Sequence, residues 1–575
     1  MQATDIDLRT ADVPAPVIPA ASRPAPRPVL AGRLKDERMD VYGLIHWGLN
    51  TYTDREWGYG DEDPKMFDPG KFDADKIAAA AKAGGLGGII LVAKHHDGFC
   101  LWPTKTTDHN ITKSPFRGGK GDVVKEFEQA CRKAGLRFGV YISPWDRHDA
   151  KYATPDYVER YHRQIRELLG GDYGEIFEMW FDGANGGDGW YGGAKEKRTI
   201  SADYYRFDEI FRFVRELQPN VCIFNERDEA DFRWPGNEEG LLEPDCRATV
   251  PHFDPANYAP YMAWSADGAH EGVSFHPPEA DFPLRRGWFY HSAQDGNSKG
   301  GEYLMKSYLR TVGNGGTMNL GLSPNKDGEL TDEDVAALRR FGEIRDAFFA
   351  KEAKEGEPFN VVVMREDISR GERIDEWSFA ADGRTLLEGR SIGTKRIRVL
   401  ESPVVVRKCA LTARTCDGGE PCVDYRLYYV DPALLTKVLR AACAGGETDT
   451  AKWMQGFRGL TARPRPMPDG AKACAELKAD VDGRPLACWT DGKTSGPTAE
   501  FAFSLRAAVT VTFPEKVAEV KVEPTEKKLR YYKGDDWVSV IVNEPGDYEL
   551  GVNGGKWRVK VIASGLDTGG VASGL

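Results

Sequence analysis

Short apolar segments rich in β-branched and aromatic residues recur along the first part of the chain. They cover residues 41–46, 88–93, 137–143, 176–181 and 220–225, so that their starts lie about 40 to 50 residues apart. Helical patterns fill the intervals. Residues 73–83 are rich in alanine behind an acidic N-cap candidate, and residues 123–131 carry apolar side chains at three- and four-residue spacing. The alternation of strand and helix predicts a parallel sheet covered by helices.

Two architectures contain such a sheet, the open doubly wound sheet and the closed (β/α) barrel. The predicted strands end in polar and aromatic residues rather than in glycine loops, which favours a TIM-like (β/α) barrel with its site at the carboxyl ends of the strands. A last helix is expected over residues 331–349, with Thr331 as its N-cap. We therefore expect a barrel domain over residues 33–350, preceded by a Pro- and Ala-rich segment over residues 1–32.

The pattern changes after residue 350. Predicted strands follow one another without helices at residues 360–366, 396–400, 404–407 and 425–430, which is typical of an antiparallel β-sandwich. Residues 432–495 look irregular, and strands return at residues 507–513, 517–522, 538–542 and 557–562. The expected fold class is α/β, with the barrel followed by a β-sandwich over residues 351–431 and a second β-rich accessory region over residues 432–575.

Composition limits the partners of the chain. Its 575 residues include 89 acidic and 77 basic side chains, for a net charge of −12, which argues against nucleic acid and against an anionic membrane surface as partners. The longest apolar run, near residues 87–93, is far shorter than the ~18 residues of a membrane-spanning helix.

The first 29 residues lack the basic-then-apolar order of a signal peptide. Either a leader has been removed or the protein is cytosolic; we expect a secreted or periplasmic bacterial protein, with its oligomeric state left open.

Histidines and carboxylates follow the predicted strands. His95 and His96 come directly after the second strand, and Asp182 follows the fourth. Polar residues after a buried strand need partners or a function, although ordinary hydrogen-bonded histidines and a simple Asp-Gly turn are the alternatives. Adjacent histidines point to opposite sides of an extended chain and no metal-ligand spacing is present, so we expect neither a metal nor a cofactor.

A loop after the fifth strand carries two more carboxylates, Glu238 and Glu239, bounded by glycine and proline. A loop carboxylate can reach over a bound sugar and form the second member of a glycosidase acid/base pair, while a solvated acidic loop is the alternative. Aromatic and polar residues near other strand ends could build a carbohydrate pocket, although core packing is the alternative for any single tryptophan. These residues are His46, Glu56, Trp57, Tyr141, Trp145, Trp180 and Trp288.

These motifs, in this order, resemble the retaining α-L-fucosidases of glycoside hydrolase family 29 from about residue 33 to about residue 345. The matching segments are residues 46–48 (HWG), 56–57 (EW), 94–99 (KHHDGF), 141–145 (YISPW), 180–183 (WFDG), 233–240 (RWPGNEEG), 287–288 (GW) and 314–324. The resemblance implies a (β/α) barrel followed by a β-sandwich.

The resemblance also implies roles for particular residues. Asp182 matches the nucleophile, and the Gly-Asn-Glu run resembles the subfamily that acts on α-1,3/1,4-linked fucose, which makes Glu238 the acid/base, with Glu239 as the competing residue. Asn225-Glu226-Arg227 departs from that subfamily's Ser-Asp pair and looks nearer the other subfamily, so Arg227 enters as a possible substrate contact. The remaining substrate-binding positions are His46, Glu56, Trp57, His95, His96, Tyr141, Trp180 and Trp288.

The resemblance therefore predicts an exo-acting retaining hydrolase that releases terminal α-linked L-fucose from a fucosylated glycan through a covalent intermediate on Asp182. Two other classes remain open. One is a glycan-binding protein on a fucosidase-like barrel without activity, and the other is a glycosidase for a related galactoside.

Overall fold

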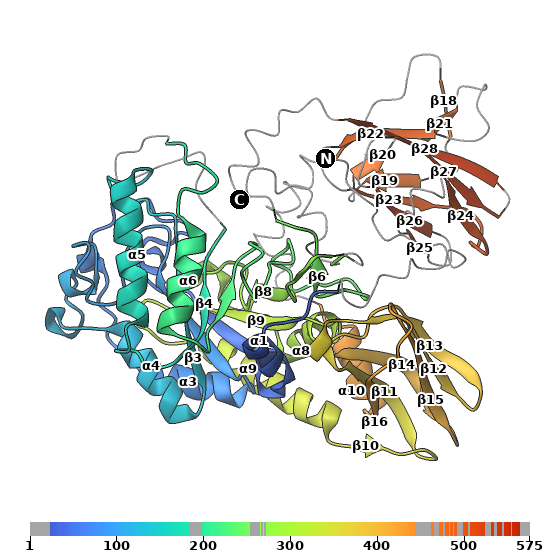
Figure 1. The fold of residues 1–575 in the computed structure, drawn as a ribbon, viewed down its shortest axis with the longest axis horizontal. Coiled ribbons are helices and arrows are strands. Elements are labelled where there is room, and N and C mark those ends of the chain that lie inside the picture. The colour runs from blue at the N-terminus through green and yellow to red at the C-terminus, as the bar shows by residue number, and fades with distance from the viewer. Residues whose placement is uncertain are drawn as a thin grey trace. The chain divides into compact units, whose positions relative to one another are not determined.

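The computed structural model (Figure 1) describes residues 23–183, 198–253, 265, 268–269 and 272–442, followed by the shorter segments 462–464, 471–474, 478–481, 484–486, 488–490, 498–503, 507–523, 531–533, 537–542, 546–553 and 555–563. Most of the predicted Pro- and Ala-rich segment therefore lies outside the described residues. The chain divides into two compact units. The larger one comprises Val17–Ala256 and Ser265–Thr450, and the smaller one consists mainly of Ala451–Ala572.

A seven-stranded parallel sheet forms the centre of the larger unit, in the order β5-β4-β3-β2-β1-β9-β8. Its strands are β1 (Val41–Ile45), β2 (Gly88–Lys94), β3 (Arg137–Ile142), β4 (Ile176–Trp180), β5 (Cys222–Phe224), β8 (Glu279–Pro283) and β9 (Thr317–Leu322). The sheet curls, and single-residue bridges join Phe224 to Phe232 and Arg233 to Pro278 beyond its two edge strands. The five predicted strands are confirmed as β1 to β5, whereas β8 and β9 were not foreseen.

Helices flank the strands of this sheet (Figure 1). They are α1 (Pro28–Lys35), α2 (Leu49–Thr53), α3 (Ala74–Ala83), α4 (Val123–Ala134), α5 (Pro155–Leu169), α6 (Phe207–Leu217), α8 (Gly301–Thr311) and α9 (Asp332–Phe349). Two predicted caps are confirmed: the Asp73 side chain accepts a hydrogen bond from the Asp75 amide at the start of α3, and Thr331 accepts one from Asp334 at the start of α9. The helices α1, α2, α5 and α8 were not foreseen.

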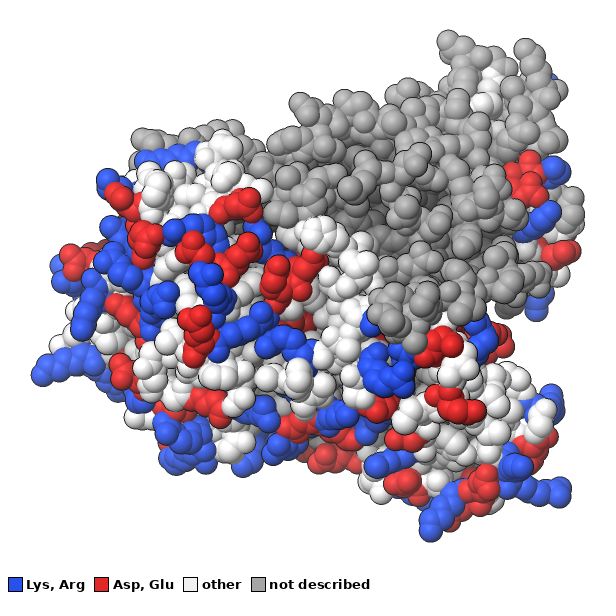
Figure 2. Space-filling model, in the orientation of Figure 1, with Lys and Arg blue, Asp and Glu red and all other residues white. Residues whose placement is uncertain are grey.

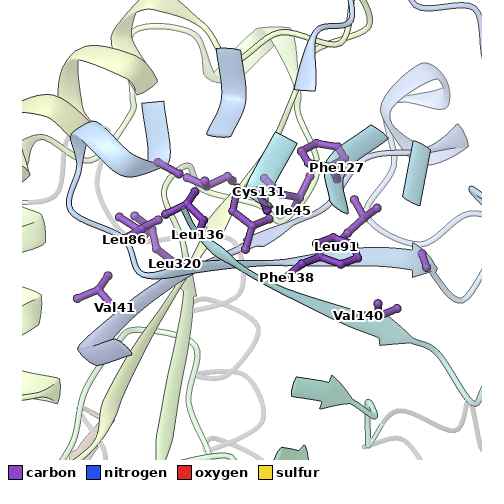
Figure 3. Packing of buried hydrophobic residues seen from close by; sticks show 14 of the residues in the cluster. Val41, Ile45, Leu86, Leu91, Phe127, Cys131, Leu136, Phe138, Val140 and Leu320 are labelled. Atoms are coloured by element: carbon purple, nitrogen blue, oxygen red, sulfur yellow. The ribbon is translucent and has the colours of Figure 1, made fainter. Parts of the chain in front are cut away.

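The outer face of the sheet packs against the helices (Figure 3). Val41 and Ile45 of β1, Leu91 of β2, and Phe127 and Cys131 of α4 belong to one buried cluster. The neighbouring residues in the strands face the opposite way and form a second cluster, whose members include Tyr42, Leu44, Ile90, Val92, Trp180 and Phe224. Period-two alternation therefore separates an outer, helix-facing core from an inner one, as expected for a parallel sheet that is buried on both faces.

The inner core contains charged groups at the level of the strand centres. Glu178 of β4 accepts a hydrogen bond of 3.1 Å from Arg33 of α1, and Glu279 of β8 accepts 2.8 Å bonds from Trp180 and Asn319. Burial and the charge of Glu279 raise the pKa of Glu178 well above its usual range. These hydrogen bonds join the buried charged groups into one polar network.

Two antiparallel sheets follow α9. One has the order β10-β16-β11-β14 and the other β13-β12-β15, and a common core formed mainly by β11 and β12 lies between them. The elements are β10 (Glu352–Ala353), β11 (Pro358–Glu366), β12 (Ile374–Ala381), β13 (Arg384–Gly389), β14 (Arg396–Val405), β15 (Cys409–Thr415), β16 (Val423–Tyr428) and α10 (Pro432–Leu439). The predicted strands are found, with the two runs at residues 396–407 joined in β14. β10, β12, β13 and β15 were not foreseen.

The described part of the smaller unit is antiparallel apart from one parallel pair, β22 with β28. Its two sheets have the orders β18-β21-β22-β28-β27-β24, with β17 beside β22, and β20-β19-β23-β26-β25. The strands are β17 (Ala462–Pro464), β18 (Lys472–Ala473), β19 (Lys478–Val481), β20 (Arg484–Leu486), β21 (Cys488–Thr490), β22 (Thr498–Phe503), β23 (Ala507–Thr512), β24 (Val520–Glu523), β25 (Tyr531–Lys533), β26 (Trp537–Val542), β27 (Gly546–Val552) and β28 (Gly555–Ala563). The β-rich character is confirmed, but the expectation of an irregular stretch over 432–495 was wrong where α10 and β17 to β21 form. The predicted domain limits at residues 350 and 431 stay predictions.

On the face of the molecule in Figure 2, acidic and basic side chains are interspersed over the described residues. None of the helices that the structure describes is both long and apolar enough to cross a membrane.

Candidate active site

The predicted site residues gather where the strands of the parallel sheet end. His46 follows β1, His95 follows β2, and Asp182 lies two positions beyond the last residue of β4, Trp180. A residue two positions beyond an inward-facing one faces inward as well. Trp180 packs in the inner cluster, so Asp182 faces the space that the curled sheet encloses.

Asp182 accepts a hydrogen bond from a neutral donor. The Tyr141 hydroxyl donates a 2.7 Å hydrogen bond to its Oδ2, and His96 Nε2 lies 3.9 Å from the same oxygen. Burial, together with the charge of Asp182, raises the pKa of Tyr141 well above its usual range, so the phenol keeps its proton as a donor. The carboxylate side chain retains 23% of its exposure, which leaves it accessible to a substrate.

The three histidines of the site are buried and neutral at pH 7. Burial lowers the pKa of His46 to about 3 and that of His96 to about 4, and it lowers the pKa of His95 well below its usual value. Their rings pack together, with centroids 5.5 Å apart for His46 and His95 and 4.0 Å apart for His95 and His96. Neutral imidazoles suit neutral sugar hydroxyls because each ring offers one donor and one acceptor.

The hydrogen bonds assign different tautomers to the two adjacent histidines. The Asn50 amide donates to His95 Nδ1 over 3.3 Å, which leaves the proton of His95 on Nε2. Ser143 donates its own proton to the Trp145 carbonyl, so its oxygen accepts from His96 Nδ1 over 2.7 Å and His96 Nε2 is an acceptor. His95 can therefore donate to a sugar hydroxyl while His96 accepts from one.

Aromatic rings surround these groups. The Trp180 ring stacks on the Tyr141 ring with their centroids 5.1 Å apart, and the ring centroids of Trp288 and His46 are 4.9 Å apart. Trp57 contacts the ring of His96 edge-on at 5.6 Å and is 46% exposed. The structure thus brings Trp57 and Trp288 against the histidines and Trp180 against Tyr141, and a sugar contact of these rings stays a prediction.

Glu56 faces a loop rather than open space. Its Oε2 accepts a 2.8 Å bond from the Trp288 amide, and its Oε1 accepts bonds from the Phe289 amide over 3.2 Å and from His291 Nε2 over 2.6 Å. Both of its oxygens are thereby engaged. A sugar contact of Glu56 stays a prediction.

Arg227 contacts residues of the segment that leads into α6 and the first residue of that helix. Its guanidinium donates a 2.7 Å bond to the Ala202 carbonyl, lies 3.6 Å from Asp203 and lies over the Phe207 ring at 5.3 Å. Its predicted substrate contact stays a prediction.

The loop that carries Glu238 and Glu239 is braced from within. Asn237 Oδ1 accepts bonds from the amides of Glu239 and Leu241, while its amide nitrogen donates to the Leu241 carbonyl. Both glutamates are half-buried. The charge of Glu238 contributes to the raised pKa of Asp281 in β8, so the two carboxyl groups lie near each other.

Sequence reasoning missed Glu226 as a site carboxyl. In the register of β4 and β5, Trp180 pairs with Phe224, so two positions further Glu226 lies beside Asp182. A Cβ built on Gly183 would lie 3.6 Å from Glu226 Oε2, which agrees with that placement. Burial and the charge of Asp182 raise the pKa of Glu226 to about 7. The sequence signal was its position two residues after a predicted inward-facing strand residue.

Asp281 is the second missed carboxyl. It follows Glu279 by two positions in β8 and shares its inward face. It is 3% exposed, and its Oδ1 has no hydrogen-bond partner among the described residues. Burial, followed by the charges of Glu238, Glu279 and Asp182, raises its pKa well above the usual range. A charged residue inside a strand gives no local signal of a site.

Within the described ranges, no group of three or more His, Cys, Asp or Glu side chains is arranged to hold a metal ion. Carboxylates, neutral histidines and tryptophans at the carboxyl ends of parallel strands form an arrangement typical of the glycoside hydrolases. The sequence model of the α-L-fucosidase family matches residues 35–346. The chain belongs to this family, and its enzyme class is therefore that of the glycoside hydrolases.

Individual proteins similar to this chain support the family assignment. The α-L-fucosidase 1 of Arabidopsis thaliana is 31% identical over 471 residues, which cover 71% of this chain and 89% of that protein. A protein of Oryza sativa subsp. japonica, also named as an α-L-fucosidase 1, is 37% identical over 58% of this chain, and the match spans 62% of that protein's length. The crystal structure of a glycoside hydrolase 29 family member from an unknown rumen bacterium is 29% identical, covers 90% of this chain and 94% of its own, and superposes with a TM-score of 0.66.

Proposed function

We propose that this protein is a retaining exo-α-L-fucosidase that removes terminal α-linked L-fucose from oligosaccharides or glycoconjugates. The observation that carries the proposal is the environment of Asp182, a part-exposed carboxylate bonded to Tyr141 beside the neutral His96, in a chain of the α-L-fucosidase family. The alternative of a glycan-binding protein without activity is less well supported, because such a protein has no need of an exposed carboxylate held in one orientation.

In the proposed reaction, Asp182 Oδ attacks the anomeric carbon as the glycosidic C–O bond breaks, and a fucosyl ester forms on Asp182. Glu238 gives its proton to the departing oxygen, then takes a proton from the water that cleaves the ester. Tyr141 orients Asp182, and the donor on His95 and the acceptor on His96 bind sugar hydroxyls. Two displacements return the original anomeric configuration.

Wild-type enzyme tests this directly. We expect turnover of aryl α-L-fucosides but not of the matching galactosides, and NMR should show α-fucose as the first-formed product. Binding of fucosyl glycans without turnover would support the binding-protein alternative, preferential galactoside cleavage would support the other glycosidase, and β-fucose as first product would overturn retention.

Besides Glu238 and Glu239, the acid/base has a third candidate, because the pKa of Glu226 near 7 suits a general acid at neutral pH. The comparison is between the Ala variants of Glu226, Glu238 and Glu239, on an aryl fucoside with a good leaving group and on an oligosaccharide with a poor one. If Glu238 is the acid, only Glu238→Ala should lose activity selectively. Its loss of kcat/KM should be at least about 100-fold larger on the oligosaccharide than on the aryl fucoside. The same selective loss in Glu226→Ala or Glu239→Ala would move the assignment to that residue.

For the linkage, we propose a preference for α-1,3/1,4-linked fucose, supported by the Gly-Asn-Glu run that ends in Glu238. Hydrolysis of α-1,2, α-1,3, α-1,4 and α-1,6 fucosyl oligosaccharides side by side tests it.

We also propose that the curled sheet is a closed barrel, in which residues 231–233 link the ends of β5 and β8. Export from a bacterial cell stays our prediction, which cell fractionation tests.

A further inference from the structure

The loop that carries Trp288 is tied to a distant segment through its backbone. The amides of Trp288 and Phe289 both donate to the Glu56 carboxylate, and the Ser323 hydroxyl donates a 2.6 Å bond to the Trp288 carbonyl. Glu56 and Trp288 are 232 positions apart in the chain. The position of the indole therefore depends on where the Glu56 carboxylate is held.

Close packing leaves this loop little alternative. A Cβ on Gly287 would lie 2.3 Å from Glu56 Oε1, and one on Gly321 of β9 would lie 2.7 Å from the Trp288 ring. The backbone on one side and the indole on the other are thus in tight contact, and a small displacement of Glu56 has to move Trp288.

His291 holds Glu56 in turn. Its Nε2 is 2.6 Å from Glu56 Oε1 and its Nδ1 is 2.7 Å from Asp54 Oδ1, directly after α2. A carboxylate only accepts hydrogen bonds, so both ring nitrogens must carry protons to make both bonds. The neighbouring Tyr290 and Asp295 are bonded to each other.

We propose that His291 is a positioning residue which, bridging Asp54 and Glu56 as an imidazolium, holds Glu56 against the loop amides and so fixes Trp288 beside His46 for substrate binding. The inference rests on the proposed function in that the substrate is a fucoside. It gives Glu56 the role of a loop support and gives His291, which has no direct place in the reaction, an effect on affinity.

The bridge depends on pH. The hydrogen bond to Glu56, followed by that to Asp54, raises the pKa of His291. A raised pKa means that the bridge is complete below the ordinary pKa of histidine and is lost as the pH rises through the higher value in the folded protein. The neutral ring can donate to only one of the two carboxylates.

The test compares His291→Gln with the control His252→Gln, which removes another histidine–carboxylate pair, with Asp228, at an exposed position. We expect His291→Gln to raise KM for an aryl α-L-fucoside about tenfold at pH 6, the size of one charge-assisted hydrogen bond, with kcat changed less than about threefold. The wild-type KM should rise toward the variant's value in alkali, and Asp54→Asn should move that rise to lower pH. The control should keep the wild-type KM and its pH profile.

Hydrogen–deuterium exchange of residues 287–291 separates this inference from the proposed function, since it needs no activity. Exchange should be faster in His291→Gln than in the wild type at pH 6, with unchanged exchange in β1 and β9. Equal exchange, or a KM difference that is constant across pH, would overturn the inference. A loss confined to kcat would overturn it as well, because it would mark a direct catalytic role. If the wild type cleaves no fucoside while exchange behaves as expected, the proposed function fails and the positioning role stands.

Discussion

Glu178 and Asp182 are two carboxylates on the same side of one strand, four residues apart, and their surroundings are opposite. Glu178 is fully buried against Arg33 and shares a network with Glu279, Tyr42 and the Trp180 indole. Asp182 keeps part of its exposure and accepts a hydrogen bond from the neutral Tyr141.

The difference shows how one strand can carry both structure and chemistry. A buried carboxyl with a cationic partner is committed to the fold, because breaking that pair leaves an unpaired charge in a medium of low polarity. A part-exposed carboxylate oriented by a phenol is accessible to a substrate. Depth in the curled sheet therefore separates a structural layer near the strand centres from a layer at the carboxyl ends that we propose to be reactive.

The largest effect is expected in the reactive layer. Asp182→Ala should lower kcat by at least about 10³-fold, because the nucleophile is lost, and azide should restore part of the turnover of an aryl fucoside. Steady-state kinetics measures both, with Asp172→Ala, at an exposed position, as the matched control. A loss of less than about tenfold would remove Asp182 from the role of nucleophile.

In the structural layer, Arg33→Ala should affect stability instead of chemistry. Removing one partner of a buried ion pair costs about 3–5 kcal/mol, which urea unfolding would measure as a lower midpoint. The double variant Arg33→Met/Glu178→Gln should recover part of this loss, because it also removes the carboxyl to which the guanidinium donated. If Arg33→Ala unfolds at the wild-type urea concentration, or if it abolishes kcat in protein that is still folded, the division into two layers is wrong.

Tyr141→Phe tests the link between the phenol and the nucleophile. It removes the 2.7 Å bond to Asp182 while keeping the ring, so we expect kcat/KM to fall about 10- to 100-fold, as for a hydrogen bond to a charged group, with a melting temperature close to that of the wild type. Tyr161→Phe is the control, since that hydroxyl donates to the Ile142 carbonyl instead. Equal activities of the two variants would deny Tyr141 any role in orienting Asp182.

Glu226 should give the smallest effect, and one that depends on pH. Its pKa is raised from 4.5 to about 7, so its contribution to folding is complete below pH 4.5 and is lost as the pH rises through about 7. Glu226→Gln imitates the protonated form, so its stability relative to the wild type should grow by about 1–3 kcal/mol between pH 5 and pH 8. Urea unfolding at both pH values measures this. A stability difference that does not change with pH would mean that Glu226 is ionised throughout, like an ordinary surface carboxylate.

The first five strands could be predicted because each is a short apolar run buried on both faces, and such a run needs no distant partner to be recognised. Polar side chains directly after β1, β2 and β4 could be placed at one edge for the same reason. The positions of the histidines and Asp182 followed from this pattern, whereas their proposed roles came from the resemblance to the α-L-fucosidases.

The elements that were missed hide polar side chains on buried faces. The inner face of α5 includes Tyr157 and Tyr161, whose hydroxyls donate to the carbonyls of Pro144 and Ile142. In β8, Glu279 and Asp281 face the interior, which gives the strand the composition of a loop. Their hydrogen-bond partners lie on segments distant in the chain, so the local sequence pattern does not predict them.

By itself, the sequence determined the repeated strand–helix order, the β-rich second half and the residues that follow each strand, since these depend on neighbours along the chain. Only the tertiary structure decided that Glu226 lies beside Asp182, that Arg33 neutralises Glu178, and that Glu56 and His291 face the Trp288 loop. Each of these contacts joins segments far apart in the chain. Whether a carboxylate supports a loop, balances a buried charge or remains open to react depends on what such contacts bring against it.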